Sequence, residues 1–310
     1  MGSMMDMNVT PEVAEALGNG GAVVALESTI ITHGMPYPDN LDMARSVETV
    51  IRQQGAVPAT IAVIDGALHI GLSDTQAEQL AQTSNAMKLS RADLAYAMIA
   101  KRTGGTTVAA TMMAAHAAGI SVFATGGIGG VHKGAETSFD ISADLDELAR
   151  TPVTVVSAGA KAILDIPKTL EALETRGVPV IAFGQSELPA FWSRNSGLDA
   201  PLRMDSAEAI ATLMARRASQ HAFAHGGILI ANPVPADAEI PLEQMSLLIE
   251  KAQLEAEAQG VSGKHVTPWL LGRILEISDG RSLQTNIALV KNNALLAANI
   301  AVSHSRIEQN

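Results

Sequence analysis

The sequence predicts an α/β fold with a mostly parallel central sheet that helices cover on both faces. Apolar runs alternate with helical segments six or seven times along the chain, which is typical of such a sheet. Several of these runs end in glycine-rich or polar segments, as strands do where an open sheet presents a site. Because no repeat, low-complexity tract or Pro/Ser-rich linker interrupts the alternation, we expect one domain.

The chain begins with residues that lie outside the expected domain. Residues 1–8 are expected to be a cloning scar, which reads MGSMM, and a disordered N-terminus, ahead of a single catalytic α/β domain over 9–310. Thr10 before Pro11 predicts a helix start, because threonine caps a first turn in which proline is tolerated. The apolar run 22–26 then predicts a buried strand.

Short-range signals place the other elements of the first half. Asn40 is expected to cap a helix that Gly55 closes, and the pair Asp65-Gly66 predicts a hairpin turn. In order, the predicted segments are the helix 11–18, the strand 22–26, the loop 28–39, the helix 40–54, the strands 59–64 and 67–70, the helix 74–82, a loop with Lys88, a capping box at Ser90 and Asp93 that opens a helix to Lys101, and an alanine-rich helix that follows Thr107 and ends at Gly119.

The second half opens with the stretch 121–165, around which we expect the site to form. Its first apolar run, 121–124, stops in the glycine-dense loop Gly126–His132, and a second run, 153–157, precedes Lys161. The remaining predicted segments are a helix from Ala143, the helix 167–176, the strand 178–183, the helix 206–219, the strand 228–231 and the helices 242–259, 267–277 and 282–302.

Composition limits the classes of partner. The chain has 310 residues, enough to bury a large core, with a net charge of −11 and only 3% aromatic residues. An acidic surface with few aromatic side chains argues against a nucleic-acid partner, and no apolar stretch reaches the roughly 20 residues of a membrane span. The chain has no cysteine, which excludes thiolate chemistry and is compatible with a cytoplasmic location.

Lys161 and Glu27 are the two candidate catalytic residues. Lys161 follows a run of small and apolar residues, and a lysine kept out of water is more readily the neutral amine that forms a Schiff base with an aldehyde. Alternatively, Lys161 opens the next helix with its amine in solvent. Glu27 follows a buried strand, where a carboxyl group suits general-acid work. The alternative for Glu27 is that it caps backbone amides of the loop 28–32.

Asp140 and Asp144 flank Ser142 after the glycine loop. Ser142 is predicted to cap the helix that starts at Ala143, with Asp144 in its first turn. Asp140 is in addition a candidate ligand for a hard cation held largely through water. One carboxylate with a few oxygens suits Mg²⁺ or Mn²⁺ better than Zn²⁺, for which the sequence has no ligand pattern.

Two further segments suggest ligand contacts. The segment Gly105-Thr106-Thr107-Val108 at a helix start is an anion site in outline, and Lys88 adds a point charge. The glycine loop invites a dinucleotide interpretation, but the required glycine position holds a histidine. Amides interrupt the otherwise apolar C-terminal helix, and they either bond across helices or bind a polar ligand edge: Asn286, Asn292 and Asn293.

Longer motifs resemble one known family, the pseudouridine-5′-phosphate glycosidases, also called the indigoidine synthase A-like family. The resemblance covers about residues 10–302. The segments that carry it are VALESTIITHGMPYPDN, GGTTVAATM, FATGGIGGVH, FDISADLDEL, AGAKAILDI, ILIANPVP and SLQTNIALVKNNA.

The resemblance implies a reaction, in which pseudouridine 5′-phosphate and water interconvert with uracil and ribose 5-phosphate. It implies Lys161 as the nucleophile, Glu27 as the proton donor and Asp140 as the metal ligand. The substrate-binding residues that it or the anion motif implies are Lys88, Thr107, Val108, His132, Ser142, Ala143, Asp144 and Asn286. It further implies one Mn²⁺ per subunit, with Mg²⁺ or another divalent ion as the alternative, an α/β/α sandwich and a homotrimer.

Three other functions remain open at the level of sequence. One is a related C–C or C–N lyase that acts on another modified nucleotide or sugar phosphate. A second is a nucleotide-binding oxidoreductase built on the glycine loop. The third, a phosphosugar sensor without catalysis, is disfavoured because Glu27 and Lys161 are both present.

Overall fold

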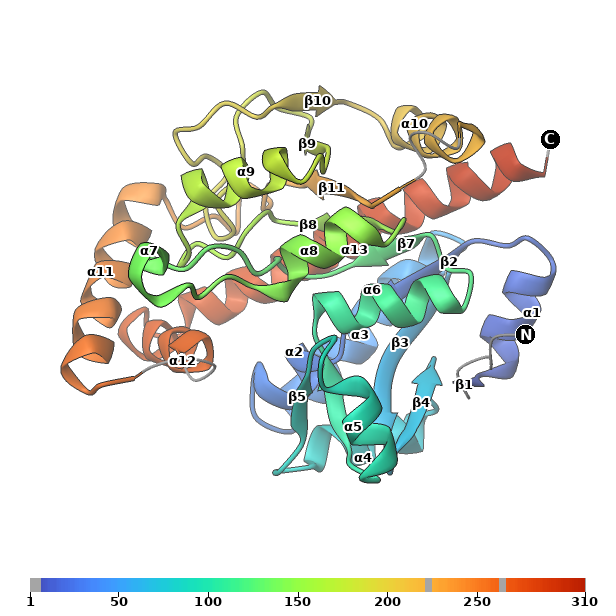
Figure 1. The fold of residues 1–310 in the computed structure, drawn as a ribbon, viewed down its shortest axis with the longest axis horizontal. Helices are drawn as coiled ribbons and strands as arrows, with labels where there is room; N and C mark the ends of the chain where they lie inside the picture. Colours follow the sequence, from blue (N-terminus) through green and yellow to red (C-terminus); the bar gives the residue numbers. More distant parts are fainter. Residues whose placement is uncertain (1–6, 221–224, 262–265, 310) are drawn as a thin grey trace.

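A computed structural model describes residues 7–220, 225–261 and 266–309, and a single large sheet runs through it (Figure 1). Its strands are short and mostly buried, as the apolar runs predict. The strands are β1 Met7–Val9, β2 Val23–Leu26, β3 Val57–Ile64, β4 Ala67–Ile70, β5 Met87–Leu89, β6 Gly104–Thr106, β7 Val122–Ala124, β8 Thr154–Ser157, β9 Val180–Phe183, β10 Leu202–Met204 and β11 Ile228–Ala231.

The sheet topology is that of an α/β protein. The strand order is β1-β4-β3-β2-β7-β8-β11-β9-β10, and β6 and β5 branch from β3. Strand pairs are parallel except β3–β4 and β3–β6. The predicted α/β class with a mostly parallel sheet is therefore confirmed, and so is the predicted hairpin that turns at Asp65-Gly66.

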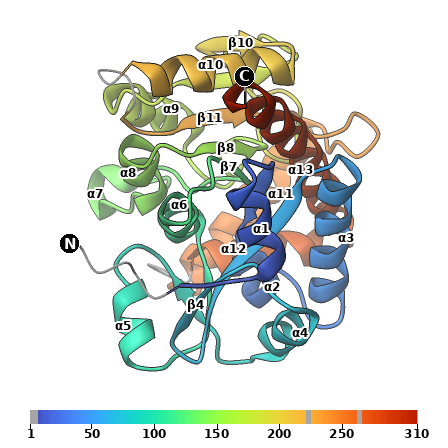
Figure 2. The ribbon, with the colours of Figure 1, turned by 90° about the vertical axis from the view of Figure 1, so that its right-hand side faces the viewer.

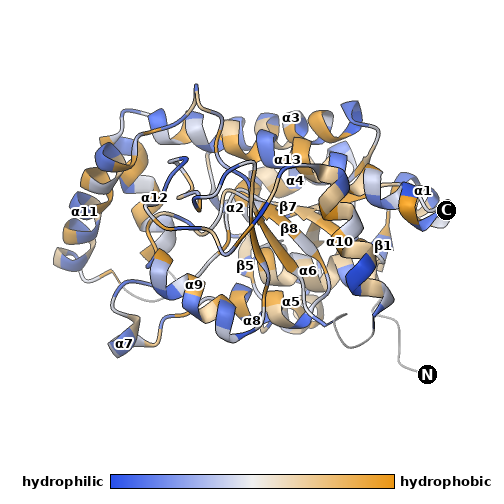
Figure 3. Ribbon diagram, turned by 90° about the horizontal axis from the view of Figure 1, so that it is seen from above, coloured by the Kyte–Doolittle hydropathy of each residue, from blue (hydrophilic) through white to orange (hydrophobic). Residues whose placement is uncertain are grey.

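Helices cover both faces of this sheet. Figure 2 shows α3 and α13 on one side of the strands and α6, α8 and α9 on the other. In Figure 3 the central strands β7 and β8 are strongly hydrophobic, whereas outer helices such as α11 carry hydrophilic residues. The helices are α1 Pro11–Gly18, α2 Thr29–His33, α3 Asp39–Gln53, α4 Asp74–Gln82, α5 Leu94–Ile99, α6 Val108–Ala117, α7 Ala135–Ser138, α8 Ala143–Arg150, α9 Ile166–Thr175, α10 Ala207–Ser219, α11 Leu242–Ala258, α12 Val266–Ile277 and α13 Arg281–Glu308. Within the described ranges, no helix is both long and apolar enough to cross a membrane.

The strand register aligns the segments that carry the predicted site. Leu26 of β2 pairs with Ala124 of β7, and Ala124 pairs with Val156 of β8. All three strands run in parallel, so the residues that follow them leave the same edge of the sheet. Helix α13 packs across the same three strands. This edge therefore collects the end of β2, the glycine loop after β7 and the segment after β8.

Several predicted details are wrong. The expected loop 28–39 contains the short helix α2. Asn40 does not cap α3, which begins one residue earlier; its buried side chain instead donates to the carbonyl oxygens of Ile31 and Ala81, at 2.8 and 3.0 Å. Lys88 lies on strand β5 rather than in a loop, because β5 pairs with the neighbouring β6.

Two other predictions fail at the ends of elements. Only half of the capping box forms at Ser90: the Asp93 carboxylate accepts from the Ser90 N–H at 2.9 Å, but α5 starts only after Asp93 and ends before Lys101. Met7 and Asn8, expected to belong to a disordered N-terminus, pair with β4 at the sheet edge. The expectation of a single catalytic domain over 9–310 stays a prediction.

Candidate active site

Glu27 stands directly after β2 and is held by two hydroxyl groups. The Thr29 hydroxyl donates to its Oε2, and the Thr125 hydroxyl donates to its Oε1. Thr125 follows β7 as Glu27 follows β2, so the pairing of the two strands brings them side by side. The alternative prediction, in which Glu27 caps backbone amides of its loop, is not what the structure contains, because both partners are side chains.

Lys161 follows β8 without entering a helix, in contrast to the alternative prediction of a solvent-facing helix start. Its half-buried side chain turns back over the glycine loop, and Nζ donates to the Gly127 carbonyl oxygen at 2.8 Å. A side chain at Gly127 would collide with the Phe191 ring, at 2.7 Å from the added Cβ. The glycine at this position therefore lets the loop pass between the Lys161 side chain and the Phe191 ring.

Lys88 lies among the other charged residues of the site. Its side chain is exposed to solvent, although protein atoms partly enclose it. This burial lowers the pKa of Lys88, and the positive charge of Lys161 lowers it further. Three carboxylates act in the opposite direction: Asp144, Glu27 and Asp140. The structure thus brings predicted residues from four separate segments within electrostatic reach of one another.

The two lysines carry no ion-pair partner. No described carboxylate forms a salt bridge with Lys88 or Lys161. The neighbouring carboxylates influence them only from a distance. Such an arrangement suits an anionic ligand, because two positive charges remain to be neutralised in a protein whose net charge is −11.

Asp144 is buried and ties two segments together. One carboxylate oxygen accepts from the Ala109 N–H in the first turn of α6 at 3.0 Å, and the other accepts from the Gly129 N–H at 2.8 Å. Thr107, the predicted anion-site residue, caps the same turn through Ala110. The Asp144 and Thr107 side chains thus accept hydrogen bonds from two of the free N–H groups in the first turn of α6. They leave the N–H of Val108 for a ligand.

Ser142 caps α8 as predicted and packs against the glycine loop. Its hydroxyl accepts from the Asp144 N–H at 3.2 Å, and Ala143 next to it is exposed. A Cβ added at Gly129 would lie 2.2 Å from the Ser142 hydroxyl oxygen. This close approach, together with the Asp144 contact, explains the glycine better than a dinucleotide site does, since the loop amide is already bound.

His132 and Asp140 face each other at the far end of the loop. The His132 N–H donates to the Asp140 carbonyl oxygen at 3.0 Å. Burial lowers the pKa of the His132 imidazole; the Asp140 charge opposes this shift, and the positive charges of the two lysines add to it. His132 is thus favoured as a neutral side chain at pH 7.

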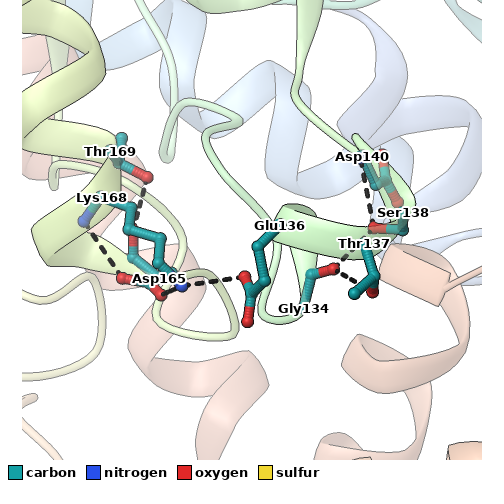
Figure 4. A network of polar contacts seen from close by, with 8 residues as sticks. All are labelled: Gly134, Glu136, Thr137, Ser138, Asp140, Asp165, Lys168 and Thr169. Carbon is teal, nitrogen blue, oxygen red and sulfur yellow. Dashed lines mark hydrogen bonds and ion pairs between the residues drawn. The ribbon is translucent and has the colours of Figure 1, made fainter.

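The segment between these two residues is the short helix α7. Figure 4 shows Glu136 of α7 beside Lys168, which also pairs with Asp165 at the start of α9. In the same view Asp140 lies beside Ser138, whose hydroxyl accepts from the Asp140 N–H at 3.3 Å. The Asp140 carboxylate itself is half-buried, and among the described residues no group of three acidic, histidine or cysteine side chains could enclose a metal.

The sequence did not identify an ion pair between an exposed arginine and a buried glutamate that holds the Lys88 strand against α8. Arg91, three residues after Lys88, donates to both carboxylate oxygens of Glu147, at 2.6 and 3.0 Å. The Glu147 side chain is only 1% exposed and also accepts from the Thr151 hydroxyl. Leaving such a carboxylate unpaired is costly, so this pair fixes β5 relative to the helix that carries Asp144.

His33 is a second residue that sequence analysis did not identify. Burial lowers the pKa of His33, and the Lys88 charge lowers it further, while a backbone hydrogen bond at Ala86 raises it. Its Nδ1 lies 2.7 Å from the Thr32 hydroxyl oxygen. The sequence did place His33 in the same strand-end segment as Glu27. Because that segment was expected to be a loop, the direction of the His33 side chain could not be predicted.

Asn286 lies on α13, and its side-chain oxygen accepts from the Trp192 indole N–H at 2.7 Å. The other two amides predicted from the sequence have different partners. Asn293 donates to the Thr125 and Gly126 carbonyl oxygens at 2.9 and 3.4 Å, and Asn292 donates to Pro233 at 3.0 Å. All three amides therefore bond to segments outside α13, but none of these partners lies on another helix, so the predicted bonding across helices is wrong in that detail.

One cavity lies away from these residues. It measures about 510 Å³ and opens between α3, α10 and the C-terminal half of α13. Its described lining includes Asn232, Asn299 and Arg306 but none of the predicted site residues. At the strand ends, Glu27, Thr125 and Val290 line a small cavity of about 20 Å³.

Fold and site together define an α/β protein with a lysine, a carboxylic acid and a cluster of anion-binding groups at the carboxyl edge of its sheet. The sequence pattern of the indigoidine synthase A-like proteins matches residues 12–303, and the chain belongs to that family.

Similar proteins span nearly the whole chain. A pseudouridine-5′-phosphate glycosidase of Mesorhizobium japonicum is 65% identical over 95% of this chain and 96% of its own length. One of Paracoccus denitrificans is 62% identical over 95% and 97%. Among solved structures, the prealnumycin C-glycosynthase AlnA in complex with ribulose 5-phosphate superposes with a TM-score of 0.90 at 34% identity, covering 98% of each chain. An indigoidine synthase A-like protein of Thermotoga maritima gives 0.88 at 32%, covering 99% of each.

Proposed function

We propose that the chain is a pseudouridine-5′-phosphate glycosidase, which reversibly cleaves the C–C glycosidic bond to give uracil and ribose 5-phosphate. The observation that carries the proposal is that Lys161 and Glu27 follow β8 and β2 at the same edge of the sheet, in a chain 65% identical to an enzyme of that name. Two lysines without ion-pair partners at the same edge support a phosphorylated substrate.

The chemistry explains why an amine and an acid are needed together. The bond joins C1′ of ribose to a ring carbon of uracil, and carbon is a poor leaving group. A carboxylate nucleophile, as in retaining O-glycosidases, bonds to C1′ as an ester, whose oxygen donates electrons too weakly to expel a carbon leaving group. An amine donates strongly enough, because its lone pair forms a C=N bond as the C–C bond breaks.

In the proposed sequence of steps, the Lys161 nitrogen bonds to C1′ and passes one of its protons to the ribose ring oxygen, which leaves C1′ and so opens the sugar. Glu27 then protonates the uracil ring carbon, the nitrogen lone pair forms C=N, and the electron pair of the breaking bond restores the ring double bond. Water adds to the iminium and returns one proton to Glu27. Loss of the amine then frees ribose 5-phosphate as the aldehyde.

The hydrogen bonds at each residue support these roles. Nζ of Lys161 is held by a single carbonyl oxygen, that of Gly127, so it can leave without breaking an ion pair. Glu27 accepts from Thr29 and Thr125, which hold the carboxyl group at the strand end. Lys88 and the Val108 N–H are suited to the phosphorylated sugar, as a point charge and a helix-start amide.

A divalent cation completes the proposal. Asp140 is a half-buried carboxylate, and in the described ranges it belongs to no group of three acidic, histidine or cysteine side chains that could hold a metal, which fits a hard ion held mainly by water and substrate oxygens. We propose Mn²⁺, one per subunit, with Mg²⁺ as the alternative. When bound, the ion supplies positive charge to substrate oxygens. The proposal also includes a homotrimer, which follows from the family resemblance alone, and a cytoplasmic location, with which the absence of cysteine is compatible.

Release of uracil from pseudouridine 5′-phosphate tests both the reaction and the metal. We expect release by the wild type, none from uridine 5′-phosphate, and loss of release after chelation that Mn²⁺ restores. Asp140→Asn should remove the response to Mn²⁺, whereas Asp146→Asn, whose carboxylate pairs with Arg176 on the outside of α8, should keep it. Absence of uracil release under any condition rejects the reaction; release that ignores chelator rejects only the metal.

A second candidate function is the synthesis of a different C-glycoside. The structural neighbour at 34% identity, a C-glycosynthase, favours it. The same amine and acid chemistry joins an open sugar phosphate to another electron-rich ring. Turnover on pseudouridine 5′-phosphate at rates ordinary for an enzyme would settle the choice for uracil.

A further inference from the structure

One side-chain contact fixes the orientation of an amide at the edge of the site. The Trp192 indole N–H donates to Asn286 Oδ1 at 2.7 Å and to the Ser282 carbonyl oxygen at 3.2 Å. An indole nitrogen can only donate, so the amide atom next to it must be oxygen. The NH₂ group of Asn286 is therefore turned away from Trp192, and the amide cannot flip without losing this bond.

Trp192 is itself held firmly. It is 1% exposed, its carbonyl oxygen accepts from the Ile240 N–H at 3.0 Å, and its ring meets the Phe191 ring edge-on at 4.9 Å. Phe191 in turn donates its N–H to Ala158 at 3.0 Å, beside the loop that leads to Lys161. These contacts hold the indole in one position beside the segments that follow the strands.

Asn286 lies on the face of α13 that meets the site. Residues four and seven positions later, Val290 and Asn293, share that face because an α-helix repeats every 3.6 residues. Val290 lines the small cavity beside Glu27, and Asn293 donates to Thr125, the partner of Glu27. No described residue accepts a hydrogen bond from the half-buried NH₂ group of Asn286.

We propose that Trp192 is a positioning residue that makes Asn286 a donor only, and so selects a base with a ring carbonyl oxygen over one with an amino group at that place. The inference rests on the proposed function, in which the base is uracil. An asparagine that is free to flip could turn its amide oxygen toward an amino group of the base and accept a hydrogen bond from it. An asparagine fixed by the indole N–H presents its NH₂ group to that amino group, so two donors face each other.

The test compares bases in the synthetic direction, with ribose 5-phosphate and either uracil or its amino counterparts, cytosine and isocytosine. For each enzyme we take the ratio of kcat/KM for uracil to that for the better amino base. Trp192→Phe keeps the ring but removes the donor, and the ratio should fall about tenfold or more as the amide gains freedom to flip. Comparing ratios between variants cancels the intrinsic reactivity of each ring.

Two further variants sharpen the test. Asn286→Asp replaces the donor by an acceptor and should shift preference toward the amino base. Trp269→Phe, the same exchange in the half-buried tryptophan of α12, should leave the ratio unchanged. The inference fails if Trp192→Phe keeps the wild-type ratio, whatever Asn286→Asp does. If the wild type forms or cleaves no uracil glycoside at all, the proposed function has failed instead.

Discussion

Lys161→Ala is expected to lower kcat on pseudouridine 5′-phosphate by at least about 10⁴-fold, since no other described side chain supplies an amine at Gly127. Substrate binding should survive. The Lys161 charge lowers the pKa of Lys88, so its removal raises that pKa and keeps Lys88 charged for the phosphate. KM is therefore expected to stay within a few-fold of the wild type, and steady-state kinetics of uracil release measure both constants.

The matched control for this variant is Lys133→Ala. Lys133 is an exposed lysine in the same segment, but its amine donates to Gln253 of α11 at 3.1 Å. It should retain wild-type turnover. If Lys161→Ala kept a substantial fraction of wild-type kcat, the amine mechanism would have to be abandoned.

Glu27→Gln should lower kcat by roughly 10²–10⁴-fold, the usual loss when a general acid is removed. The amide has nearly the same shape and still accepts from Thr29 or Thr125, so the fold should be preserved. Because the glutamine amide cannot donate the proton that the uracil carbon needs, the rate of uracil release should fall most. Covalent capture of ribose 5-phosphate by Lys161, which needs no proton on the uracil carbon, should be less affected.

Glu48→Gln is the matched control, because Glu48 is also a carboxylate that accepts a hydrogen bond from a threonine hydroxyl. Glu48 is half-buried on α3 and accepts from the Thr60 hydroxyl at 2.6 Å, and burial raises its pKa. Its exchange for glutamine should leave kcat unchanged. Equal losses in Glu27→Gln and Glu48→Gln would make Glu27 a structural residue.

The sequence predicted those parts of the site that depend on one strand end at a time. Glu27 and Lys161 each follow an apolar run bounded by polar or glycine-rich segments, and these runs became β2 and β8 within a residue or two of the expected limits. Ser142 was correctly placed as a cap because serine before an acidic first turn is a local signal.

What depends on contacts between distant segments was not predictable from one sequence. Thr125 reaches Glu27 only because β7 lies beside β2, and strand order is not encoded in either strand. Asn40 carries a cap-like residue type, but its burial between two carbonyl oxygens decides its role. Trp192 and Asn286, 94 positions apart, meet through α13 and carry no shared sequence signal.

The most direct test of the account is to trap the covalent intermediate. The protein is incubated with ribose 5-phosphate and borohydride, and the modified residue is located by peptide mass spectrometry. We expect one ribose-phosphate adduct per chain, on Lys161, absent from Lys161→Ala and present in Lys133→Ala. An active enzyme that gives no adduct, or an adduct on a different lysine, would contradict the proposed mechanism.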